Sequence, residues 1–318
     1  MAAESAWKLG GLTWKELGKR IWGEMNEDDV FGRSAALSYY FLLALFPMML
    51  FLVSMLGMAA GPGTELRGNL MEYLGKVLPG SASGLVQQTV DQTAQNSGGG
   101  KLSFGILAAL WSASAGITAI MSTLNVAYDL KESRPFWKVR GIALGLTIAL
   151  SVLVISALTL VLYGGKIANF VGGLLHMGSA FSIAWFVVQW PLVLFALLAA
   201  FALVYYWAPN VKQQKWYWIT PGAFIGVTLW LVASFGFKVY LNFFNNYSAT
   251  YGSLGAVIIL MLWFYVTGLS ILVGGEINAE IEHAAAARGD QAARGRGQTA
   301  SQSEEGSSPT RIEKRPAA

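Results

Sequence analysis

Six long apolar stretches dominate this chain, and the segments between them alternate between many and few basic residues. The stretches are Ala35–Ala60, Leu102–Leu124, Gly141–Tyr163, Phe181–Trp207, Ile219–Leu241 and Leu254–Gly275. A helix needs about 20 apolar residues to cross a hydrocarbon core of about 30 Å, and each stretch is long enough. The pattern predicts an all-α, polytopic membrane protein with six transmembrane helices.

The basic residues predict which way the helices run. Of the 22 Lys and Arg residues, 17 lie before the first stretch, after the second, after the fourth or in the C-terminal tail. The other side holds Arg67, Lys76, Lys101 and Lys166, while Lys238 lies inside the fifth stretch. Short basic loops stay in the cytoplasm, so both termini are predicted to be cytoplasmic.

Composition agrees with a membrane protein. Hydrophobic residues make up 54%, charged residues 13%, and the mean hydropathy is +0.48, whereas soluble domains carry about 25% charged residues. The net charge of +4 follows from the basic cytoplasmic side, so it does not indicate nucleic acid. Since the chain has no cysteine, disulfides, thiolate metal sites and cysteine nucleophiles are excluded.

Residues 1–34 are predicted to be a cytoplasmic amphipathic segment. Trp14, Leu17, Ile21 and Trp22 recur at helical spacing, with basic residues between them. Such a helix lies on the lipid surface with its aromatic face inward, or docks against the inner side of the membrane helices. The sequence leaves both alternatives open.

The remaining chain divides into a transmembrane domain, 35–283, and a tail, 284–318. Within the domain, the external loop 61–101 repeats Leu66, Leu70, Leu74 and Val77 at helical spacing, which predicts an external helical hairpin. The hairpin is either functional or a cover for the helix ends. The tail has no aromatic residue and is predicted to be disordered.

Two features inside the stretches bear on how the helices pack. Pro47 and Pro191 lie within the first and fourth stretches and predict kinks, which are common in transporters but also in membrane helices generally. Small-residue spacings, at Gly141/Gly145 and Gly222/Gly226, predict close approach between helix backbones.

Polar residues gather at the cytoplasmic ends of the second and sixth stretches. The candidates for a substrate or gating site are Asn125, Asp129, Glu132, Arg134 and Glu276. Charges near lipid need partners, so we expect an ion-pair network joining Glu276 to Arg134, Lys138 or Arg33. This network either sets helix packing as a clasp or binds and gates a substrate.

Groups for catalysis are scarce. The two histidines, His176 and His283, lie in an external loop and in the cytoplasmic tail. No P-loop and no cluster with metal-ligand spacing occurs. The sequence therefore predicts a protein that is not an enzyme, with no cofactor and no metal.

Several motifs in order carry a resemblance to a known family. They are Ala35-Ala-Leu-Ser-Tyr-Tyr, Leu45-Phe-Pro47, Leu124-Asn-Val-Ala-Tyr-Asp129, Tyr206-Trp-Ala-Pro-Asn210, Tyr247-Ser-Ala-Thr-Tyr-Gly-Ser-Leu-Gly255 and Gly274-Gly-Glu276. Over about residues 12–282 the chain resembles the YihY/BrkB-like membrane proteins, once mislabelled ribonuclease BN. The resemblance implies a bacterial inner-membrane protein of six helices, and a link to envelope lipid movement has been suggested for relatives.

Two functions remain as hypotheses. The first is a transporter-like protein that moves a lipid or other amphipathic solute, with membrane lipids as partners. The second is a non-transporting scaffold for envelope assembly, with envelope proteins as partners. Neither involves nucleic acid, a ribonuclease activity is disfavoured, and the oligomeric state stays open.

Overall fold

The computed structural model describes residues 6–59, 100–174, 178–211, 219–243 and 253–289, and these residues form helices and connections without a strand. The elements are the 3-10 helix η1 (Ala6–Gly11) and the helices α1 (Trp14–Glu27), α2 (Val30–Ala59), α5 (Gly100–Ala127), α6 (Phe136–Leu174), α7 (Gly178–Trp207), α8 (Pro221–Phe243) and α10 (Ser253–Ala287). Within the described ranges, six helices are long and apolar enough to cross a membrane: α2, α5, α6, α7, α8 and α10. The predicted all-α, six-helix membrane fold is confirmed.

The helices extend beyond the apolar stretches that predicted them. α2 begins at Val30, before the predicted start at residue 35, and α10 continues through Ala287, past the predicted start of the tail at residue 284. The proposed external hairpin falls almost wholly on residues 60–99, and the rest of the tail on residues 290–318, so both lie outside the described residues. Both stay predictions.

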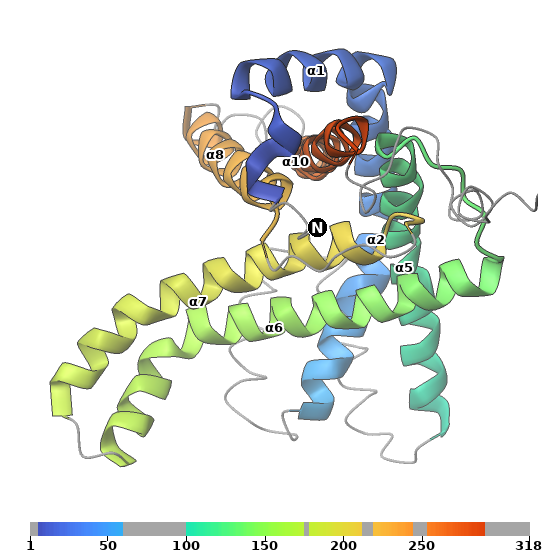
Figure 1. Ribbon diagram of the computed structural model, residues 1–318. Helices are drawn as coiled ribbons and strands as arrows, with labels where there is room; N and C mark the ends of the chain where they lie inside the picture. Colours follow the sequence, from blue (N-terminus) through green and yellow to red (C-terminus); the bar gives the residue numbers. More distant parts are fainter. Residues whose placement is uncertain (1–5, 60–99, 175–177, 212–218, 244–252, 290–318) are drawn as a thin grey trace, which may run out of the picture.

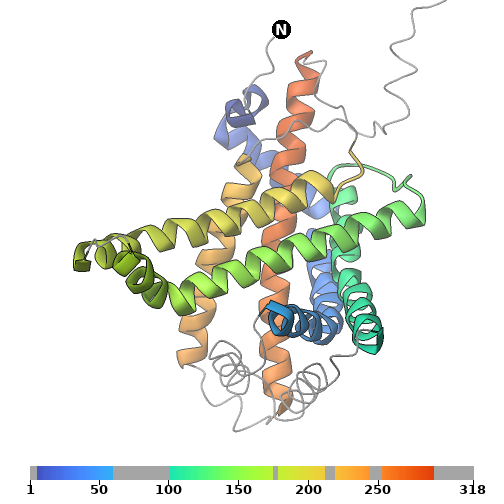
Figure 2. The ribbon, with the colours of Figure 1, turned by 90° about the horizontal axis from the view of Figure 1, so that it is seen from below.

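The helices run in several directions rather than as one parallel bundle. Figure 1 shows α6 and α7 side by side as a long antiparallel pair that extends beyond the other helices. Figure 2 shows this pair lying across α8 and α10. α10 packs against α2 and α8, and α2 also packs along α5.

Helix ends that are predicted to face the cytoplasm meet around the second half of α10. Leu37 near the start of α2, Leu124 near the end of α5, Tyr205 near the end of α7 and Ala223 at the start of α8 are buried together with Leu272 of α10. Alternate ends of successive spans must lie on one side of a membrane, so this convergence agrees with the predicted order of spans. The side itself stays a prediction.

Glycine sets the close contact between α8 and α10. A Cβ atom on Gly222 would lie 2.0 Å from the Gly274 carbonyl oxygen, and one on Gly226 would lie 3.0 Å from another carbonyl of α10. The predicted close approach is confirmed at this pair. The same prediction is wrong for Gly141 and Gly145, which have nothing within 4 Å of an added Cβ.

The N-terminal helix α1 docks against α10 by one face only. Leu17 is buried and packs with Ile277 and Ile281 of α10. Trp14 and Trp22 of the same helix are 60% and 63% exposed. The Leu17 face of α1 therefore docks against α10, as one of the two alternatives predicted. Contact of Trp14 and Trp22 with a lipid surface stays a prediction.

The two membrane prolines lie inside continuous helices. α2 continues through Pro47 and α7 continues through Pro191. Each proline lacks the N–H that would bond the carbonyl four residues earlier, which weakens both helices at that turn. The kinks themselves stay a prediction.

Candidate functional site

The connection between α5 and α6 is held by one ion pair. Arg134 donates from Nε to Oε1 of Glu132 at 2.8 Å and from Nη2 to Oε2 at 2.6 Å, which is a bidentate arrangement. Its terminal nitrogens also donate to the carbonyl oxygens of Ala208 (2.9 Å) and Pro209 (3.4 Å), just after α7. The Arg134 side chain is only 8% exposed. Its donors are thus used inside the protein.

Two asparagines tie the same connection to α5 and α7. Asn125 is buried near the end of α5, donates to Glu132 Oε2 at 2.8 Å and accepts from the Asn210 backbone N–H at 2.7 Å. The Asn210 side chain donates to the Lys131 carbonyl and to Ser133 Oγ. We call Asn125, Glu132, Arg134 and Asn210 the clasp.

The electrostatics of the clasp favour a structural role. Burial opposes ionisation of Glu132, but hydrogen bonds from Arg134 and Asn125 outweigh it and hold the pKa of Glu132 below its usual value. The carboxylate therefore stays charged and paired. An arginine that is already bidentate to a carboxylate has little capacity left for a substrate anion, so this arrangement favours the packing alternative for Arg134, Glu132 and Asn125, and a role in binding or gating stays a prediction.

Two other acidic side chains meet where the corner between α1 and α2 touches α10. The carboxyl groups of Asp28 and Glu276 are in hydrogen-bond contact. Glu276 is 1% exposed, and its Oε1 has no hydrogen-bond partner among the described residues. Burial, then the charges of Asp129 and Glu24, raise the pKa of Asp28 to about 6. Because carboxylates only accept hydrogen bonds, this contact requires a proton on one of the two groups.

The predicted ion-pair network around Glu276 is therefore wrong. Arg134 turns toward the end of α7, Arg33 donates from Nε to the backbone carbonyl of Asp28 at 2.6 Å, and Lys138 is exposed. The physical reason is the neighbour of Glu276, which is the acidic α1–α2 corner and not the basic start of α6. Asp129, a turn residue with φ of 52°, lies near this acidic pair and outside the clasp.

A cavity of about 420 Å³, lined by both polar and apolar side chains, lies between α2 and α5 and reaches the first turns of α6. Two arginines line it, Arg33 from α2 and Arg140 from α6, together with hydroxyl groups that include those of Tyr40 and Ser122. Both Tyr40 and Ser122 are exposed, so the cavity opens to the surface along the helices. We call it the arginine cavity.

Neither arginine of this cavity is paired with a carboxylate in the described part of the chain. The guanidinium of Arg140 lies 4.0 Å from the centre of the Trp111 ring and donates to the Trp111 carbonyl, while its Nε is buried without a hydrogen-bond partner. Arg33 uses its Nε on a carbonyl, as described above. Among the described residues neither guanidinium group forms a close ion pair with a carboxylate, although the charge of Arg33 acts on nearby Asp28.

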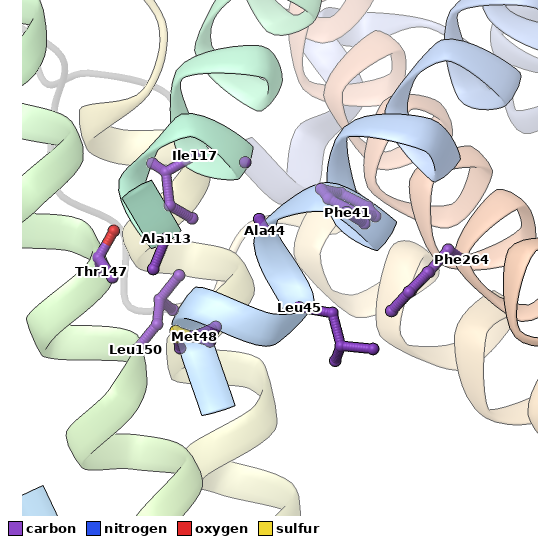
Figure 3. A pocket seen from close by; sticks show the side chains of 10 residues that line it. Phe41, Ala44, Leu45, Met48, Ala113, Ile117, Thr147, Leu150 and Phe264 are labelled. Carbon is purple, nitrogen blue, oxygen red and sulfur yellow. The ribbon is translucent and has the colours of Figure 1, made fainter. Parts of the chain in front are cut away.

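A second, apolar cavity of about 190 Å³ lies farther along the same helices. Figure 3 shows side chains of α2, including Phe41 and Met48, between Thr147 and Leu150 of α6 on one side and Phe264 of α10 on the other. The Thr147 hydroxyl donates to a carbonyl of its own helix at 2.7 Å, so it leaves no unsatisfied group in the cavity. We call it the apolar cavity.

The pattern of single residues did not reveal the arginine cavity. In the sequence, Arg140 and Arg33 both indicate the orientation of the helices, and Arg33 is also an expected partner for Glu276. The available signal was the hydroxyl groups of Thr118 and Ser122, four residues apart on one helix and facing these arginines. Among the residues that the structure describes, no three His, Asp or Glu side chains are placed to hold a metal ion.

Comparison with known proteins places this chain in a family. The family model described as "Virulence factor BrkB" matches residues 21–298. A "Putative ribonuclease-like protein YfkH" of Bacillus subtilis is 40% identical over 247 residues, which cover 78% of this chain and 88% of the relative. A "UPF0761 membrane protein" of Aeromonas salmonicida is 29% identical, covering 81% of this chain and 86% of the relative. No solved structure matches.

Proposed function

This chain belongs to the virulence factor BrkB family of membrane proteins, and we propose that it is a transporter-like protein of the bacterial inner membrane that moves a lipid or other amphipathic solute. The observation that carries the proposal is the arginine cavity. It combines two arginines without a carboxylate partner, several hydroxyl groups and an opening along the sides of α2 and α5. A solute held in the bilayer reaches such a site from the side, without first entering water.

The chemistry of the cavity selects for negative charge. Arginine presents a planar fork of donors that matches phosphate and carboxylate groups. A cation close to the hydrocarbon region is costly unless it is paired or hydrated. An anionic group of the solute supplies that partner, and the apolar cavity beside it supplies a place for the remainder of an amphipathic molecule.

We further propose that the protein is not an enzyme. The ribonuclease-like name belongs to the Bacillus relative, and cleavage of RNA needs a metal site or an acid–base pair that faces the cytoplasm. The acidic pair Asp28–Glu276 is packed into the α1–α2 corner, and Glu276 is buried. It has no room for an RNA backbone.

The test is movement of lipid in reconstituted vesicles. Purified protein is placed in phosphatidylcholine vesicles with a fluorescent phosphatidylglycerol on both leaflets, and an impermeant quencher is added outside. Movement predicts quenching beyond the outer-leaflet half, reduced in the double variant Arg33→Gln/Arg140→Gln. The matched control Lys138→Gln removes an exposed charge on the same helix and should quench like the parent. Folded protein with no excess quenching would refute lipid movement and favour the scaffold alternative.

A further inference from the structure

We propose that one anionic phospholipid binds along α2, with its phosphate between Arg33 and Arg140 and part of one acyl chain in the apolar cavity. This inference rests on the proposed function, since it names the substrate class and the pose at the same cavities. It differs from that function in one respect: it requires binding and does not require movement across the membrane.

The two cavities are consecutive on the same three helices. On α2 the lining passes from Tyr40, in the arginine cavity, to Phe41, in the apolar cavity. On α5, which runs the other way, it passes from Thr118 to Ile117. On α6 it passes from Arg140 to residues two and three turns later. One elongated ligand therefore meets the polar lining and then the apolar lining without crossing another helix.

The polar half fits a phosphate better than a neutral headgroup. Trp111 fixes the Arg140 guanidinium through its ring and its carbonyl, and the Nε of Arg140 remains buried without a partner. Arg33 keeps its two terminal nitrogens for a ligand, because only its Nε is bonded within the described residues. Two such forks carry two positive charges toward one cavity, which a phosphodiester with its charged oxygens neutralises in part.

The apolar half fits a hydrocarbon chain. Apart from the hydroxyl of Thr147, which bonds its own helix, its lining consists of aliphatic, aromatic and thioether groups, with Phe41 and Phe264 in edge-to-face contact at 5.8 Å between ring centres. A cavity without unsatisfied polar groups does not retain water and accepts an apolar ligand. The thioether of Met48 is flexible and adapts to ligands of different shape.

The length of the two cavities matches one leaflet. Arg33 and Met48 are 15 positions apart on α2, which is about 22 Å along a helix that rises 1.5 Å per residue. Half of a bilayer of about 40–45 Å, which includes the headgroup regions, is about 20–22 Å. A phosphate at Arg33 therefore lies at the interface while the acyl chain reaches toward the middle of the bilayer, as in the cytoplasmic leaflet that the basic residues predict.

The experiment is photo-crosslinking of the full-length protein in nanodiscs, with phosphatidylglycerol that carries a diazirine on one acyl chain. We expect the label on peptides that contain the apolar lining, near Met48 or Ala113, and at least a tenfold loss in Arg33→Gln/Arg140→Gln. Lys138→Gln should label like the parent. Ala113→Leu narrows the apolar cavity and should move the label elsewhere while leaving the helices folded, as judged by circular dichroism and gel filtration.

Three results would overturn the inference: equal labelling in the double arginine variant, equal labelling by a phosphatidylcholine probe, or complete competition by soluble glycerol phosphate, which indicates a site for free phosphate. The vesicle assay separates this inference from the proposed function. Arginine-dependent labelling without excess quenching supports the lipid site and refutes movement. Excess quenching that persists in the double arginine variant supports movement and refutes this site.

Discussion

Removal of the Arg134 guanidinium should destabilise the protein without removing lipid binding, because its donors are occupied by the protein itself. Arg134→Met breaks two bonds to Glu132, at 2.8 and 2.6 Å, and the bonds to the carbonyls after α7. Breaking a buried ion pair costs about 3–5 kcal/mol. Since Glu132 is 33% exposed and regains water, we expect a smaller loss of about 2–3 kcal/mol in the free energy of unfolding.

A double-mutant cycle with Glu132→Gln isolates the pair. Reversible unfolding in mixed detergent, followed by circular dichroism, should give a coupling energy of about 1.5 kcal/mol, because neighbours in one network do not add. Lys138→Met is the matched control and should change stability by less than about 0.5 kcal/mol. A coupling energy below about 0.5 kcal/mol would refute the clasp. Normal stability with lost lipid labelling would instead place Arg134 in the binding site.

Two further predictions concern single residues, and a third concerns activity on RNA. Gly222→Ala forces a Cβ to 2.0 Å from the Gly274 carbonyl and should lower the melting temperature strongly, whereas Gly141→Ala meets open space and should be neutral or slightly stabilising. Asp28→Asn should be more stable than the parent at pH 7.5 and equal to it below about pH 4, in thermal melts against pH; a constant difference refutes this. Purified protein should leave labelled RNA intact with Mg²⁺ or Mn²⁺.

The sign for Asp28 follows from its raised pKa. Its folded pKa of about 6 lies above the ordinary 3.8, so between these values the folded state binds more protons than the unfolded state. The contribution of Asp28 to stability is then fully present below about pH 4 and is lost as the pH rises through 6. Asparagine resembles the protonated acid at every pH, so its stability advantage over Asp28 grows as the pH rises from about 4 to 6 and is complete above about pH 6.

The hydrophobic pattern predicted the spans because a helix that crosses a membrane needs apolar side chains along its whole length, whether they face lipid or other helices. α2 begins at Val30 and α10 ends at Ala287, both outside the predicted apolar stretches. A helix can continue beyond its membrane-spanning part where other residues pack against it, as they do around the buried Ala284. The crosswise course of α6 and α7 has no signature in a single sequence. It depends on which side chains interlock between helices, and that information is spread over the whole chain.

The sequence predicted which polar residues belong to the candidate site, but not which of them contact one another. Asn125, Glu132 and Arg134 are close in sequence, so their proximity could be inferred, and they do meet. The partner of Glu276 could not be inferred from the sequence, because it depends on how the α1–α2 corner at Asp28 packs against α10. The place of Arg140 at a cavity could not be predicted either, because the cavity is formed by residues of three helices, α2, α5 and α6.

The structure separates the residues that hold the helices from those that are free to meet a ligand. The clasp joins α5 to the end of α7, Tyr205 donates to the Ile271 carbonyl of α10 at 2.8 Å, and the Gly222 N–H donates to Asn278 at 2.9 Å. These bonds fix the ends of α5, α7, α8 and α10 to one another. The walls of the two cavities, by contrast, are built mainly from van der Waals contacts of α2 with α5 and α6. Variants at the fixed ends should therefore change stability first, and variants at Arg33 and Arg140 should change binding first.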